Sequence, residues 1–290
     1  MVNSPAILAD ARAPAPAGWL DVVQAGPYHV GLMNDPDPVA SARPRRRAIY
    51  LLPNLLTTGC LFSGFYAIVA AIDGNFERAG MAVFVAMLFD GLDGRVARLT
   101  STESAFGKEY DSLADMVAFG VAPAIVSYQW GVARIAEYGR AWGRLGWLAA
   151  FFYAVAAALR LARFNTRVAT QDKRYFEGLP SPSAAAVVSG FIWASTEWRE
   201  PGLAGLIVAF SVTALAGALM VSPLSFPSFK NFDWTRPVRF VWLVIAVLIL
   251  VVIAGDPSRA LLLSFGSYAL FPPLAWVVRR LRRLRRRERA

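Results

Sequence analysis

The sequence predicts an all-α integral membrane protein with about eight transmembrane helices, and three observations carry this prediction. Its 290 residues are 56% hydrophobic and only 17% charged, which is not the composition of a soluble protein. From residue 54 onward, apolar segments long enough to cross about 30 Å of hydrocarbon follow one another. The polar joints between them alternate in charge, as loops on the two sides of a membrane do.

Each predicted span is an apolar segment whose ends are set by polar joints. In chain order, the spans are residues 54–72, 79–99, 111–132, 145–164, 182–198, 203–221, 238–254 and 261–278. The joints between them contain residues 73–78, 95–108, 134–144, 160–174, 199–203, 230–239 and 256–259. Residues 1–42 are rich in Ala, Pro and Asp and lack the basic and then apolar pattern of a secretory signal. We expect them to form a flexible cytosolic extension.

Basic residues predict that both termini face the cytoplasm, because Lys and Arg accumulate on the inner side of short loops. The cytosolic side would hold residues 43–47, the turn with Arg95, Arg98 and Lys108, the joints 160–174 and 230–239, and the tail 279–289. The joint with Arg134, Arg140 and Arg144 goes against the rule. The protein is therefore expected in the inner membrane of the cell, with eight spans and its active site facing the cytoplasm.

The composition also excludes several kinds of chemistry. A single cysteine, Cys60, excludes an internal disulfide, a cysteine-based zinc site and an iron–sulfur cluster. A single histidine, His29, excludes a mechanism that needs two imidazoles. The formal net charge of +10 is concentrated beside the spans, so it indicates membrane contact and no nucleic-acid partner. Catalysis would have to use carboxylates, hydroxyls and basic groups.

Four aspartates lie within or at the ends of the second and third spans. Asp90 and Asp93 are three residues apart, and Asp111 and Asp115 are four apart, so each pair projects from one helical face. A carboxylate inside a membrane costs about 2.5–3.5 kcal/mol and persists mainly where it has a function. Four converging negative charges repel one another, and divalent cations with oxygen ligands are their natural counter-ions. The sequence therefore predicts a metal site, of the kind that two cations occupy in phosphoryl transfer.

Small residues accompany these aspartates and allow two interpretations. The residues are Gly91, Gly94, Ala97 and Gly107. They could leave room for a nucleotide to approach the backbone, or they could simply let membrane helices pack closely. The second interpretation does not account for the carboxylates, because helix packing needs none.

The string DGLDGRVARLTSTESAFGKEYDSLAD, from Asp90 to Asp115, resembles the signature of the CDP-alcohol phosphotransferase family, D-x2-D-G-x2-A-R-x8-G-x3-D-x3-D. Members of that family displace CMP from a CDP-linked lipid or alcohol with a hydroxyl nucleophile, on a core of six membrane helices. The resemblance implies that Asp90, Asp93 and Asp111 hold two divalent cations, Mg²⁺ or Mn²⁺. It implies further that Asp115 shares a metal and serves as general base. The residues that would line the CDP site are Gly94, Ala97, Arg98 and Gly107.

Further stretches are similar to the bacterial and archaeal phosphatidylserine synthase branch of this family. PNLLTTGCLFSGF at 53–65 looks like the first helix, in which Asn54 and Thr57 would face the nucleotide. RLARFN at 160–165, FEGLPSP at 176–182 and SFPSFK at 225–230 look like that branch. The resemblance implies transfer of the phosphatidyl group of CDP-diacylglycerol to L-serine by a homodimer in membrane lipid. It also implies a catalytic core at 43–235, with two further helices and a basic tail at 236–290.

Arg160, Arg163 and Asn165 are the candidate residues for the serine carboxylate or a lipid phosphate. A guanidinium can bind either anion with two hydrogen bonds. Alternatively, the two arginines only reach the membrane surface from the end of the fourth span. The sequence leaves both interpretations open.

Rival functions share part of this pattern. Synthases of phosphatidylglycerophosphate or phosphatidylinositol phosphate would carry the same aspartate signature. A cation transporter also uses intramembrane carboxylates, but spreads its ligands over unwound helices. An inactive scaffold of the same fold would be expected to have lost at least one of the four aspartates.

Overall fold

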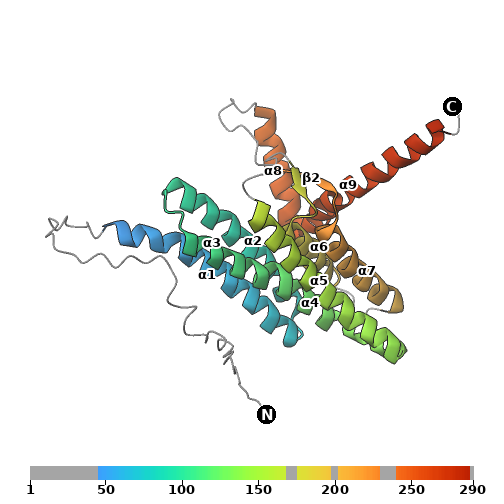
Figure 1. Ribbon diagram of the computed structural model, residues 1–290. Helices are drawn as coiled ribbons and strands as arrows, with labels where there is room; N and C mark the ends of the chain where they lie inside the picture. The colour runs from blue at the N-terminus through green and yellow to red at the C-terminus, as the bar shows by residue number, and fades with distance from the viewer. Residues whose placement is uncertain (1–44, 168–174, 197–201, 229–239, 288–290) are drawn as a thin grey trace, which may run out of the picture. The chain divides into compact units, whose positions relative to one another are not determined.

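A computed structural model of the chain describes residues 45–167, 175–196, 202–228 and 240–287 (Figure 1). The chain divides into two units, residues 1–43 and 44–290, and every described residue belongs to the second. The predicted cytosolic extension at 1–42 lies outside the described residues, as do the joint at 230–239 and most of the basic loop after residue 167.

The described chain is almost entirely helical. Its α-helices are α1 (Arg45–Ile72), α2 (Phe76–Leu99), α3 (Ala105–Asp115), α4 (Ala122–Trp130), α5 (Arg140–Arg167), α6 (Ser181–Ala194), α7 (Leu203–Val221), α8 (Phe240–Gly255) and α9 (Pro257–Arg287). A π-helical segment, η1 (Met116–Val121), joins α3 to α4, and a 3₁₀ helix, η2 (Val132–Tyr138), follows α4. Each of the eight predicted spans is mostly helical where it is described, and α3, η1 and α4 together make most of the third.

Five helical stretches of the described chain are long and apolar enough to cross a membrane. They are Leu51–Ile72, Ala105–Tyr138, Arg140–Thr166, Leu203–Val221 and Pro257–Arg282. Helix α6 is apolar but only 14 residues long, and α2 carries the charged residues of the aspartate signature. The prediction of a helical membrane protein is confirmed, whereas the count of eight spans stays a prediction.

Small residues bring the helices of the core close together. A Cβ added to Gly64 of α1 would lie 2.6 Å from the Cα of Ala118 in η1, closer than atoms pack. A Cβ added to Gly80 of α2 would lie 2.7 Å from the Cβ of Trp193 in α6. Such contacts are typical of membrane helices, whose association depends on close backbone approach. They fix α2 and η1, which flank the aspartates, against the rest of the bundle.

Two short strands depart from the all-α prediction. β1 (Tyr175–Glu177) and β2 (Ser225–Pro227) pair antiparallel, with Phe176 opposite Phe226. Gly178 follows β1 with φ +79°, and its N–H donates to the Leu224 carbonyl at 2.8 Å. The strand pair thereby ties the connection before α6 to the connection after α7.

Helix α9 packs against α6 and reaches the strand pair. The ring of Tyr268 lies 5.8 Å from that of Phe226, and its hydroxyl donates to the Pro227 carbonyl at 3.0 Å. The C-terminal helix is therefore part of the structure around β1 and β2.

Candidate active site

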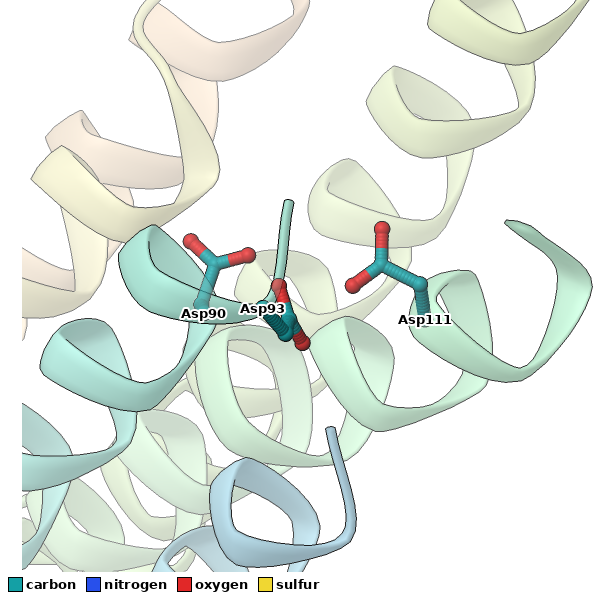
Figure 2. Close-up of side chains that lie close together, drawn as sticks. All are labelled: Asp90, Asp93 and Asp111. Carbon is teal, nitrogen blue, oxygen red and sulfur yellow. The ribbon is translucent and has the colours of Figure 1, made fainter. Parts of the chain in front are cut away.

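Three of the predicted aspartates face one another across the turn between α2 and α3. Asp90 and Asp93 come from the last turns of α2, and Asp111 comes from α3 (Figure 2). One carboxylate oxygen of each lies within 4.8 Å of one oxygen of the other two. Asp93 is buried, whereas Asp90 and Asp111 are partly accessible. This geometry allows all three to contact a common cation.

Hydrogen bonds fold the α2–α3 turn back on itself. The Thr102 N–H donates to the Ala97 carbonyl at 3.0 Å, and the Thr100 and Thr102 hydroxyl oxygens are 2.7 Å apart. Ser104 caps α3, because its hydroxyl oxygen accepts the Gly107 N–H at 3.0 Å. The turn therefore connects α2 to α3 in a way that brings Asp111 close to Asp90 and Asp93.

Asp115 lies deeper in the same site, at the last residue of α3. Its carboxyl group comes within hydrogen-bonding reach of Asp90. Its Oδ1 atom is buried and has no hydrogen-bond partner. A buried polar atom without a partner is unfavourable unless a ligand, ion or water completes it. Asp115 thus has a free acceptor beside the other three carboxylates.

The charges of the site favour cations. Within the described part of the chain, no Lys or Arg lies within 4 Å of any of the four carboxylates as an ion pair. Arg160 interacts electrostatically with Asp115 from α5, but it is a single positive charge against four negative ones. An oxygen-only donor set with an unpaired buried oxygen fits a divalent cation. The residues present therefore fit the metal that the sequence predicts.

Helix α1 contributes Thr57 and Asn54 to the site. The Thr57 hydroxyl is buried, lying 2.7 Å from Asp93 Oδ2 and 3.1 Å from the Pro53 carbonyl oxygen, and can donate to either. The Oδ1 atom of Asn54 lies 3.4 Å from the place that a Cβ of Gly107 would occupy. Thr57 therefore orients one carboxylate of the aspartate cluster, whereas Asn54 lies beside Gly107 near the start of α3.

Gly94, Ala97 and Arg98 lie on α2 just beyond Asp93. A Cβ added to Gly94 would meet only the Arg98 guanidinium, at 4.0 Å. Arg98 is exposed and Ala97 is partly accessible. The structure therefore leaves this surface open for a ligand, although its part in binding CDP stays a prediction.

The three candidate residues on α5 have different surroundings. Arg160 is 9% exposed, donates to the Ser181 hydroxyl oxygen at 3.0 Å, and has a buried Nε atom without a partner. Arg163 donates to the carbonyl oxygens of Glu177 and Met220, at 2.9 and 3.2 Å. Of the three, Arg160 is the residue that interacts electrostatically with Asp115.

Asn165 lies two residues after Arg163 and contacts α3 instead. Its side-chain amide donates to the Ser112 hydroxyl oxygen at 3.0 Å, and Ser112 directly follows Asp111. Asn165 thereby fixes the helix that carries two of the four aspartates.

Sequence analysis missed Tyr153, which is fully buried on α5 and donates to the Phe119 carbonyl at 3.1 Å. Tyr153 lies seven residues before Arg160, so both side chains project from one face of α5. That spacing could have indicated a shared contact surface.

The fold and site together define a helical membrane protein with an acidic centre that could hold a metal ion. A family model described as CDP-alcohol phosphatidyltransferase matches residues 50–224, which include all four aspartates. The chain belongs to the CDP-alcohol phosphatidyltransferase family.

Curated relatives match beyond the signature. The chain is 38% identical over 231 residues to a CDP-diacylglycerol–serine O-phosphatidyltransferase of Helicobacter pylori, covering 79% of this chain and 92% of that one. It is 33% identical over 218 residues to the enzyme of the same name from Mycobacterium tuberculosis, covering 71% of each chain. It is also 36% identical over 178 residues to an archaetidylserine synthase of Methanothermobacter thermautotrophicus, covering 61% of this chain and 69% of the relative.

Proposed function

We propose that this protein transfers the phosphatidyl group of CDP-diacylglycerol to the hydroxyl of L-serine, giving phosphatidylserine and CMP. The observation that carries the proposal is the convergence of Asp90, Asp93 and Asp111 within 4.8 Å, in a chain of this family. The relatives' names support serine as the alcohol.

Asp90, Asp93, Asp111 and Asp115 would hold two divalent cations, Mg²⁺ or Mn²⁺. When bound, the cations would neutralise the pyrophosphate and the charge that develops on the departing CMP. The four carboxylates would fix the cations and, through them, the pyrophosphate of the lipid substrate. Asp93 is held for this role by the Thr57 hydroxyl.

Asp115 would act as general base. A serine hydroxyl is a poor nucleophile at neutral pH, so a base must take its proton as the oxygen attacks the lipid-side phosphorus. The buried, unpartnered Oδ1 atom of Asp115 supports this assignment, because it is the free acceptor of the site.

The CDP half of the substrate would lie along the start of the α2–α3 turn. Its proposed contacts are Asn54, Thr57, Gly94, Ala97, Arg98 and Gly107. The open surface beside Gly94 and the exposure of Arg98 support this placement of the nucleotide.

Arg160 is the proposed ligand of the serine carboxylate. Its unpartnered Nε atom and its electrostatic interaction with Asp115 support this role. Arg163 and Asn165 would act indirectly, because their side chains already bind the β1 connection and Ser112. Of the alternatives left open by the sequence, simple contact with the membrane surface is disfavoured for Arg160 by its burial.

The enzyme would lie in the inner membrane as a homodimer of eight-span subunits, with both termini and the active site on the cytoplasmic side. The basic turn that contains Arg95 and Arg98 supports this orientation. CDP-diacylglycerol and membrane lipid would reach the site from the bilayer, and serine from the cytoplasm.

Release of CMP tests the proposal. Purified protein would receive CDP-diacylglycerol and Mn²⁺, with serine, glycerol phosphate and inositol phosphate in parallel. We expect CMP release with serine, at least tenfold above the other two alcohols. CMP release with glycerol phosphate or inositol phosphate alone would reassign the protein to another activity of this family, and none with any alcohol would contradict the proposal.

A further inference from the structure

In η1, the π-helical segment that follows Asp115, the carbonyl of Phe119 has no α-helical hydrogen-bond donor. In an α-helix, the carbonyl oxygen of residue 119 accepts the N–H of residue 123. Residue 123 is proline, which has no N–H. Phe119 is fully buried, so water does not readily replace the missing donor. The Phe119 carbonyl therefore lacks its α-helical donor, and a donor from another helix can take that place.

Tyr153 supplies this donor from α5. Its hydroxyl donates to the Phe119 carbonyl oxygen at 3.1 Å, and its side chain is 0% exposed. The bond joins α5 to η1, which are far apart in the sequence. Among the described residues, Tyr153 is the only one through which α5 places a buried hydroxyl against η1. It therefore satisfies two buried polar groups at once.

The same face of α5 contacts both ends of the π-helical segment. A Cβ added to Gly120 would lie 3.2 Å from the Cβ of Ala157, so the two backbones are close. Two turns after Tyr153, Arg160 interacts electrostatically with Asp115, which immediately precedes the segment. π-helical segments occur often at functional sites, where they change the direction of the residues before and after them. Here the segment sets how the end of α3 presents Asp115.

We propose that Tyr153 is a positioning residue for the metal site, which acts by holding η1 in its π-helical form. Without its hydroxyl, the Phe119 carbonyl is left buried and unpaired, and the segment shifts to find another donor. Asp115 moves with the segment, away from Asp90 and the other carboxylates. This inference rests on the proposed metal site, but not on which alcohol the enzyme uses.

Tyr153→Phe tests the proposal, with Tyr128→Phe as the matched control. Both substitutions remove one hydroxyl from a tyrosine packed in the bundle core, and Tyr128 lies on α4 in contact with both core clusters. The full-length protein would be titrated with Mn²⁺ alone, and bound Mn²⁺ would be measured by electron paramagnetic resonance. Since loss of an outer hydrogen-bond partner typically weakens metal binding about 10- to 100-fold, we expect the Mn²⁺ dissociation constant of Tyr153→Phe to rise about tenfold. That of Tyr128→Phe should match the unsubstituted protein.

A second measurement covers the case in which Tyr153→Phe is too unstable to purify. Mn²⁺ that binds the folded state raises the melting temperature by an amount that depends on the ratio of its concentration to its dissociation constant. In detergent extracts of a fluorescent fusion, the variant should need about tenfold more Mn²⁺ for the same rise. Equal Mn²⁺ affinity of Tyr153→Phe and the unsubstituted protein in either measurement would overturn the inference. No Mn²⁺ binding by the unsubstituted protein would instead contradict the metal site of the proposed function.

Discussion

At the scale of single residues, Arg160 and Arg163 differ although they lie one turn apart on α5. Arg163 donates to two backbone carbonyls and so joins α5 to the connections around β1 and α7. Arg160 has one hydroxyl partner and a buried Nε atom that no group completes. A buried guanidinium with a free donor beside an acidic site is suited to bind an anionic substrate group.

Arg160→Lys should raise the KM for serine by about tenfold, because Lys keeps the charge but loses the forked geometry that binds a carboxylate. The KM for CDP-diacylglycerol should change much less. Arg163→Lys is the matched control, and it should lower the melting temperature without a selective effect on serine. Steady-state kinetics with each substrate varied in turn would measure the difference. An equal rise for both substrates would assign Arg160 to the lipid phosphate instead.

Asp115→Asn keeps the size of the side chain but removes its ability to accept a proton. Turnover should therefore fall by about two or more orders of magnitude, the usual contribution of a general base. CDP-diacylglycerol binding, measured by equilibrium titration, should fall much less. Turnover near that of the unsubstituted protein would exclude Asp115 as the base.

Removal of metal should abolish activity, because four carboxylates without cations repel both one another and the pyrophosphate of the substrate. Excess EDTA should stop CMP release, and Mg²⁺ or Mn²⁺ added beyond the chelator should restore it. Asp90→Ala and Asp111→Ala should each be inactive even with added metal. Undiminished CMP release in EDTA would contradict the metal-assisted mechanism.

At the scale of helices, close backbone contact holds the aspartates in place. α1 approaches η1 at Gly64, where any side chain would meet the Ala118 backbone. α1 also reaches α2 through Gly59, at which an added Cβ would lie 3.1 Å from the Phe89 ring. Helix α1, which supplies Thr57, is thereby packed against α2, which carries Asp90 and Asp93, and against η1, which follows Asp115.

Gly64→Ala should destabilise the protein by about 1–3 kcal/mol, since overpacking in a tight core forces the backbones apart. Gly266→Ala is the matched control, because a Cβ there would meet nothing within 4 Å and Ala favours helix over Gly. Thermal unfolding in detergent would compare the two. A melting temperature of Gly64→Ala at or above that of Gly266→Ala would contradict the close packing of α1 on η1.

The helices could be predicted from the sequence, whereas their irregular features could not. The predicted span 203–221 has the bounds of α7, because its ends are set by local polarity alone. The aspartates could be placed together because spacings of three and four residues define a helical face. The pairing of β1 with β2 joins residues about fifty apart, and the hydrogen bond of Tyr153 to Phe119 joins α5 to a segment more than thirty residues away. Such features arise from tertiary contacts, which local patterns do not encode.

At the scale of the whole chain, the residues beyond the family model contribute to the structure around the site. The family model matches residues 50–224. Tyr268 of α9 lies beyond that range and contacts Phe226 and Pro227 in β2, the strand that pairs with β1.

Helix α2 offers the sharpest test of membrane orientation, because its two ends should face opposite sides of the membrane. Asp73→Cys lies in the turn before α2 and Glu103→Cys in the turn before α3, and both positions are exposed. Ser104 is left unchanged because it caps α3. Both substitutions would be made in a Cys60→Ala background, since Cys60 is the chain's only cysteine. Cells would be labelled with a membrane-impermeant thiol reagent before and after permeabilisation.

We expect Asp73→Cys to be labelled in intact cells and Glu103→Cys only after permeabilisation. The basic turn between α2 and α3 favours the cytoplasm, and the aspartate cluster beside it must meet a water-soluble alcohol there. Labelling of both positions in intact cells would mean that α2 does not span the membrane. Labelling of Glu103→Cys alone in intact cells would place the active site outside and exclude a cytosolic supply of serine.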